Sequence, residues 1–86
     1  MSLMAENTQQ LTVAVTAAIN GDWQTAHNIA QDYEDSNTAN WLHAVLHKIE
    51  GDVSNSKYWY AKTKSKSFED FGDVTLELEA ILRDLK

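Results

Sequence analysis

The chain has 86 residues, with 13 acidic and 7 basic side chains, a net charge of −6, no cysteine and no proline. This length gives room for one domain, the lack of cysteine excludes disulfides and thiolate metal sites, and the acidic balance argues against non-specific nucleic-acid binding. No apolar run is long enough to span a membrane and no signal peptide is visible, so we expect a cytoplasmic protein.

Five helices are predicted in chain order, because apolar residues recur at helical spacing and no strand-like alternation is sustained. Residues 1–3 resemble a remnant of an expression vector, and residues 4–86 are expected to form one all-helical domain. The first helix should begin at a capping box of Asn7 and Gln10 and end at Gly21. Its apolar stripe is Leu11, Ala14, Val15, Ala18 and Ile19.

The second predicted helix is capped by Asp22 and is broken by the polar residues 34–37. Its inner face is Trp23, Ala26, Ile29, Ala30 and Tyr33. The third helix should start at Ser36 or Asn37 and stop at Gly51. Its buried stripe is Ala39, Leu42, Val45, Leu46 and Ile49.

The fourth predicted helix is capped by Asp52 and runs to about Lys64, before a polar connection over residues 65–72. The fifth helix begins at Asp73. Its apolar face is Val74, Leu78, Ile81, Leu82 and Leu85. The opposite face, expected to meet solvent, carries Glu77, Arg83 and Asp84.

Two Gly-Asp pairs, at residues 21–22 and 51–52, are 30 residues apart and mark an internal repeat. Five positions after each glycine stands a small residue, Ala26 or Ser56, where we expect two helices to approach closely. A third pair follows after only 21 residues, and Glu77 occupies its small-residue position. The repeat therefore covers about two units.

Four residues of the second unit, Ser56, Trp59, Tyr60 and Thr63, resemble the Ala-x-x-Trp-Tyr-x-x-Ala signature of Sel1-like repeats, which are related to tetratricopeptide repeats. The resemblance covers about residues 20–66 and implies antiparallel helical hairpins in right-handed stacking, closed by a capping helix over about residues 73–86. It also implies a scaffold that binds other proteins. The string from Trp41 to Tyr60 resembles a small family of short helical proteins as well, which implies no activity.

Three residues at spacings of four and three, His43, His47 and Glu50, share one helical stripe. Two histidines at this spacing can bind one metal ion, and a carboxylate could complete the set. His27 supplies a third nitrogen if the second helix packs against the stripe. Ala44 stands where the zincin motif requires glutamate, which excludes that metalloprotease mechanism. The alternatives are histidines that form structural hydrogen bonds or belong to a binding surface.

Aromatic residues are concentrated around the same hairpin. The repeat places Trp59 and Tyr60 inward, so we expect Tyr58 to be substantially exposed. Trp41 lies on the far side of the third helix from the histidines and is also expected to be partly exposed, so the two could form a recognition patch. The alternative is a thin core filled by large side chains. Four lysines at positions 57, 62, 64 and 66 could meet an acidic partner or phosphate, or could lie on a solvated helix end.

The leading functional hypothesis is a protein–protein interaction module with an unknown protein partner, without enzymatic activity and without a cofactor. No serine elbow and no glycine-rich phosphate loop is present in the sequence. The alternative is a small metal- or ligand-binding protein that uses His43, His47 and Glu50. A homodimer that buries Trp41 or Tyr58 is a third hypothesis, and neither nucleic acid nor membrane is an expected partner.

Overall fold

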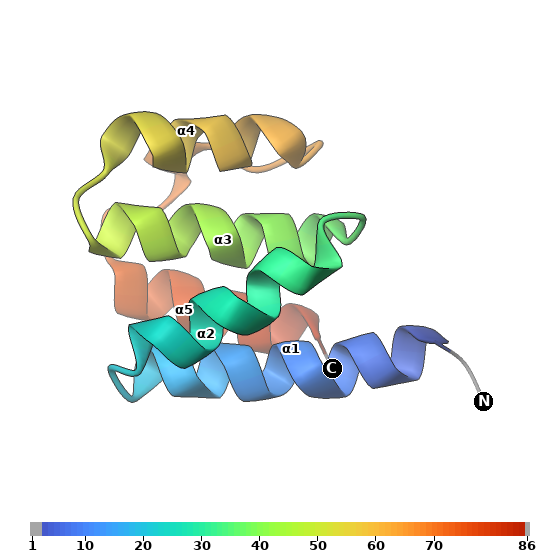
Figure 1. Ribbon diagram of the computed structural model, residues 1–86. Coiled ribbons are helices and arrows are strands. Elements are labelled where there is room, and N and C mark those ends of the chain that lie inside the picture. Colours follow the sequence, from blue (N-terminus) through green and yellow to red (C-terminus); the bar gives the residue numbers. More distant parts are fainter. Residues whose placement is uncertain (1–2, 86) are drawn as a thin grey trace.

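The computed structural model describes residues 3–85, with side chains from residue 8 onward. These residues form five α-helices and no strand, which confirms the all-α prediction (Figure 1). The helices are α1 (Leu3–Ile19), α2 (Trp23–Ala30), α3 (Asn37–Ile49), α4 (Val53–Lys62) and α5 (Val74–Asp84). Two 3₁₀ turns, η1 (Gln31–Tyr33) and η2 (Phe68–Asp70), lie in the connections. No helix among the described residues is long and apolar enough to cross a bilayer.

Helix boundaries follow the capping residues of the sequence. The side chains of Asp22, Ser36, Asp52 and Asp73 each accept a hydrogen bond from the backbone N–H three residues further on. The start of the first helix was predicted wrongly, because α1 begins at Leu3 and extends upstream of the expected capping box. Leu3 therefore belongs to a helix, and Met1 and Ser2 lie outside the described residues.

Both Gly-Asp turns close in the same way. Gly21 and Gly51 have φ values of +88° and +84°, in the left-handed region. The amide of Gly21 donates to the Ala18 carbonyl and the amide of Asp22 donates to the Ala17 carbonyl, which is a Schellman motif. The amides of Gly51 and Asp52 form the corresponding hydrogen bonds, so the repeated sequence produces a repeated turn.

Helix α3 lies in the middle of the molecule and contacts all four other helices (Figure 1). As a result every residue from Ala39 to His47 is buried, not just one stripe. Ile49, which was predicted to be buried, is 41% exposed because it is the last residue of α3, next to the Gly51 turn. Ile19 ends α1 in the same way and is 39% exposed, also contrary to prediction.

The two hairpins, α1–α2 and α3–α4, each consist of antiparallel helices, as predicted. Ala26 and Ser56 are both completely buried, which confirms the expected close approach at these positions. The hydroxyl of Ser56 donates to the Ala44 carbonyl at 2.6 Å, so a small polar residue joins α4 to the backbone of α3. The right-handed stacking and the likeness to Sel1-like repeats stay predictions.

Helix α5 packs against α3 and α1 (Figure 1). Its residue Glu77 was predicted to face solvent but is completely buried. Its carboxylate accepts hydrogen bonds from Trp41 Nε1 at 2.9 Å, Tyr60 Oη at 2.5 Å and Lys48 Nζ at 2.8 Å. These donors lie on α3 and α4, so they determine where α5 docks.

Trp41 was expected to be partly exposed, and this prediction was wrong. The side chain is only 3% exposed, because its indole N–H points at Glu77 on α5 and Lys66 Nζ lies 4.3 Å from its ring centre. Burial, followed by the hydrogen bond to Glu77, raises the pKa of the Tyr60 phenol. Tyr60 therefore stays protonated and donates to the carboxylate.

Candidate functional site

Three histidines converge between α2 and α3. One ring nitrogen of each of His27, His43 and His47 lies within 4.8 Å of those of the other two. The ring centroids are 4.7 Å apart for His27–His43, 5.0 Å for His43–His47 and 5.4 Å for His27–His47. The second helix therefore does pack against the histidine stripe, which was the condition for His27 to join it. These side chains are called the three-histidine cluster below.

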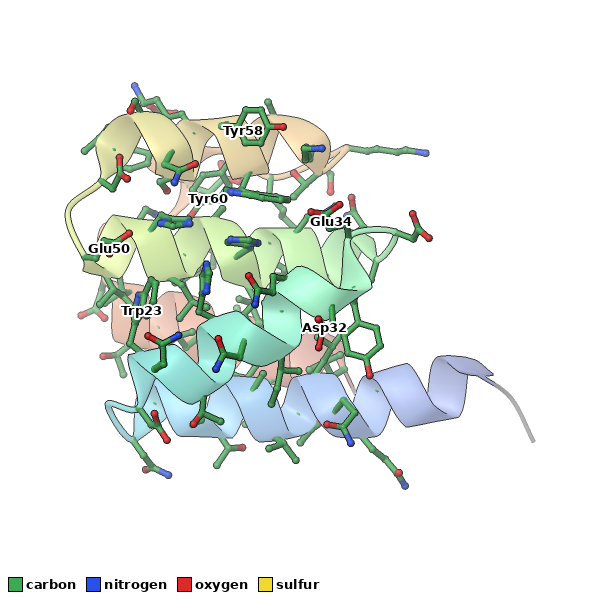
Figure 2. The ribbon with its side chains drawn as sticks, viewed as in Figure 1. Trp23, Asp32, Glu34, Glu50, Tyr58 and Tyr60 are labelled. Atoms are coloured by element: carbon green, nitrogen blue, oxygen red, sulfur yellow. The ribbon has the colours of Figure 1, made fainter. Side chains whose placement is uncertain are left out.

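Trp23 positions the α2 side of the cluster. Its indole N–H donates to the Leu46 carbonyl of α3 at 2.7 Å, so it fixes α2 against α3. Its ring stacks on His27 with centroids 4.6 Å apart and an angle of 9° between the planes, and its ring centroid lies 6.0 Å from that of His47. In Figure 2 the labelled Trp23 and Glu50 lie at the same end of α3.

Trp59 covers the other side of the cluster from α4. It stacks on His43 with centroids 3.8 Å apart and 14° between the planes. The cluster is therefore enclosed by indole rings from α2 and α4, on the face of α3 between these helices. His43 and His47 are only 4% and 7% exposed, while His27 is half-buried.

Glu50 contacts one ring nitrogen of His47. Its Oε1 lies 2.6 Å from His47 Nδ1, and Asn55 Nδ2 lies 3.4 Å from His47 Nε2. Since an ionised carboxylate only accepts, we assign the proton of His47 to Nδ1 and the lone pair to Nε2. Carboxylates commonly orient metal-binding histidines in this way. The sequence indicated Glu50 as a ligand of the same ion, whereas the geometry makes it a partner of His47.

A second group of possible ligands shares His47. One nitrogen of His47 and one oxygen of each of Glu50 and Asp52 lie within 4.8 Å of one another. Both carboxylates are solvent-accessible, and Asp52 also caps α4 through the amide of Asn55 at 3.3 Å. This group is therefore explained by helix capping and by the His47–Glu50 contact.

Two imidazoles of the cluster, those of His43 and His27, have lowered pKa values, which favours their neutral form. Burial, followed by the nearby His27 and His47, lowers the pKa of His43 to about 4. Burial also lowers the pKa of His27, followed by a contribution from His47, with a smaller opposing effect from Glu50. Neutral imidazoles have the lone pair that a metal ion requires, so these two residues need not lose a proton at neutral pH.

One nitrogen of the cluster lacks a partner. His43 Nδ1 is buried and forms no hydrogen bond in the described structure. Buried polar atoms are nearly always hydrogen-bonded, so an orphan of this kind requires an explanation. In the tautomer that leaves the lone pair on Nδ1, a bound cation is one such explanation.

The two aromatic residues that were predicted to form a recognition patch, Trp41 and Tyr58, differ in exposure. Trp41 is buried against Glu77, whereas Tyr58 is 55% exposed on α4, as predicted. The roles of Trp23 and Trp59 at the cluster were missed. The four-residue spacing of Trp23 and His27 was a usable signal, because it places the two rings on one helical face.

Comparison with known proteins gives no significant match to any family model, curated sequence or solved structure.

Proposed function

We propose that this protein binds one divalent transition-metal ion through the imidazoles of His27, His43 and His47. The observation that supports the proposal best is the convergence of three imidazoles from two helices, one of which keeps a buried nitrogen without a partner. Imidazole ligands suit Zn²⁺, Cu²⁺ and Ni²⁺, whereas Mg²⁺ and Ca²⁺ prefer oxygen. The expected ligand is therefore a borderline metal ion.

Small side-chain movements are enough to form the site. Nitrogens about 2.0–2.1 Å from a tetrahedral zinc ion are about 3.4 Å from one another. The three nitrogens lie within 4.8 Å of one another, so they need to approach by at most about 1.4 Å. Rotation of the half-buried His27 could supply most of this movement, since His43 and His47 are held on a single helix.

Glu50 would strengthen the site without binding the ion. With Nδ1 of His47 donating to the carboxylate, Nε2 is left as the ligand atom and the ring becomes a better donor. Asn55 would have to release its long contact with this nitrogen. Three protein ligands leave a fourth position for water or another small ligand.

A thermal titration tests this function. Zn²⁺ or Ni²⁺ at a hundredfold excess over the dissociation constant should stabilise the folded chain by about 2.7 kcal/mol and raise the Tm by about 10 °C or more. The His43→Gln/His47→Gln variant should lose this rise. Glu50→Gln should keep it but bind about tenfold to a hundredfold more weakly.

Mg²⁺ provides the metal control and should leave the Tm of the wild-type chain unchanged. Equilibrium dialysis should find one zinc ion per wild-type chain, which separates binding from the general effects of the substitutions. An unchanged Tm of the wild-type chain in millimolar zinc and nickel would reject the proposal.

A protein–protein interaction module in the cytoplasm is the second candidate function. The specific observation that favours it is the exposure of Tyr58 on α4, next to the lysine-rich segment that follows. The patch predicted from the sequence loses Trp41, which is buried, so the binding surface must be sought on α4 alone.

A further inference from the structure

A positive segment stands out on this acidic chain. Residues 57–66 hold four of its seven basic side chains and no acidic one. Helix α4 lies at the edge of the molecule and packs against α3 and η2 (Figure 1). Figure 2 shows Tyr58 in front of α4, and its side chain is exposed.

A hollow of about 320 Å³ opens between α4 and η2. Its lining combines two lysines, three apolar or aromatic residues, a serine and one acid: Lys57, Lys66, Tyr60, Ala61, Phe68, Ser67 and Glu69. Ala61 is exposed, and its small side chain leaves room beside the ring of Phe68. The hollow therefore combines a mainly polar lining, which includes two cationic side chains, with the smaller apolar contributions of Ala61 and Phe68.

Both lysines of the hollow are placed by aromatic rings. Lys57 Nζ lies 5.4 Å from the ring centre of Phe68, and Lys66 Nζ lies 4.3 Å from that of Trp41. In contacts of this kind the electron-rich face of the ring attracts the ammonium group. Neither contact neutralises the ammonium group.

The positive charge is largely uncompensated. Lys57 pairs with Glu69 at 3.8 Å, but both side chains are more than half exposed, so the pair is weak and readily exchanged. Within residues 8–85, no salt bridge involves Lys62, Lys64 or Lys66. A carboxylate from outside could therefore replace Glu69 and gain several cations at once.

We propose that the hollow between α4 and η2 binds a short acidic segment of a partner protein. One carboxylate of the segment would lie between Lys57 and Lys66, and an apolar side chain next to it would pack on Ala61 and Phe68. A short segment fits better than nucleic acid, because the chain as a whole has a charge of −6 and would repel an extended polyanion. The proposal is independent of the three-histidine cluster.

Nuclear magnetic resonance tests the proposal with a defined probe, an eight-residue peptide that contains two Leu residues and otherwise only Asp and Glu. Titration at low salt should shift the amide signals of Lys57, Ala61, Lys66 and Phe68. The Lys57→Gln/Lys66→Gln variant should bind the peptide at least about tenfold more weakly. Its circular dichroism spectrum should match that of the wild-type chain.

The matched control is Lys64→Gln/Arg83→Gln, which removes the same charge at exposed positions outside the hollow and should keep most of the affinity. A peptide with Asn and Gln in place of the acids should not bind. Equal weakening in both double variants would overturn the proposal, as would shifts away from α4 and η2. Tighter binding of a single-stranded oligonucleotide or of inorganic phosphate would also overturn it, because the partner class would then be wrong.

Discussion

Glu77 joins α5 to α3 and α4, because its buried carboxylate accepts three hydrogen bonds from these helices. A charged residue on an amphipathic helix is expected to face solvent, and the spacing of Leu78, Ile81 and Leu82 supported that expectation. In the structure Glu77 is buried because three donors from α3 and α4 meet it. No local pattern contains this information, since Trp41 and Tyr60 are 36 and 17 residues away.

The histidines, in contrast, were predictable in part. Their spacing on α3 is a local property, so the stripe of His43 and His47 could be identified from the sequence. The approach of His27 depends on how α2 packs against α3, which one sequence does not specify. The orphaned nitrogen of His43 is likewise a consequence of tertiary packing.

The lowered pKa values of His43 and His27 predict how stability depends on pH. In the unfolded chain both groups take up a proton near pH 6.5, whereas in the folded chain His43 does so only near pH 4. The unfolded state therefore binds more protons between these values, and the free energy of unfolding should fall as pH decreases from about 6.5 to 4. His43 alone accounts for up to about 3 kcal/mol of this loss.

Urea denaturation of the metal-free chain at pH 7.5 and pH 5 measures this effect. The His43→Gln variant should lose clearly less stability than the wild-type chain over the same interval. An identical pH dependence in the two proteins would show that His43 does not titrate as described.

At the scale of the elements, helix ends were predicted better than helix faces. The ends of α2, α3, α4 and α5 depend on capping groups within three or four residues, so they are local and readable. The faces depend on how many neighbours a helix has. For α3, which is surrounded, the predicted stripe was too narrow, and Asn40, Trp41 and Ala44 were missed as buried residues.

The Gly51 turn gives a prediction at this scale. Its φ of +84° is unfavourable for any residue with a Cβ, although an added Cβ would meet no atom within 4 Å. Gly51→Ala should therefore destabilise the fold by about 1–2 kcal/mol, through backbone conformation alone. Chemical denaturation measures the difference.

Gly72 is the matched control for this substitution. It also has open space around the position of an added Cβ, but its φ is not in the left-handed region. Gly72→Ala should change the stability by less than about 0.5 kcal/mol. An equal loss of stability at the two glycines would show that the left-handed backbone conformation of Gly51 is not its cause.

Considered as a whole, the molecule is organised around α3, with different chemistry on its sides. On its α5 side, Lys48 of α3 pairs with the buried Glu77 of α5. On its α2 and α4 sides, the two histidines of α3 meet His27 of α2 and the indole rings that come from α2 and α4. The fold class could be predicted because helical periodicity runs along the chain. The path of α5 could not, because it depends on a buried ion pair between distant residues.

These two sides differ in how fully their polar groups are satisfied. Both carboxylate oxygens of Glu77 accept hydrogen bonds, so this network is complete and serves to connect α5 to α3. The cluster retains an unpaired buried nitrogen on His43. This contrast favours the cluster over the ion pair as the proposed binding site.

The central claim is that one metal ion binds to three imidazoles, and X-ray absorption spectroscopy of the zinc-loaded chain at pH 7.5 tests it most directly. The spectrum should show three imidazole nitrogens at about 2.0–2.1 Å and one further light ligand. This signature should disappear in the His43→Gln/His47→Gln variant. A zinc shell made of oxygen ligands, as exposed carboxylates would give, would contradict the claim.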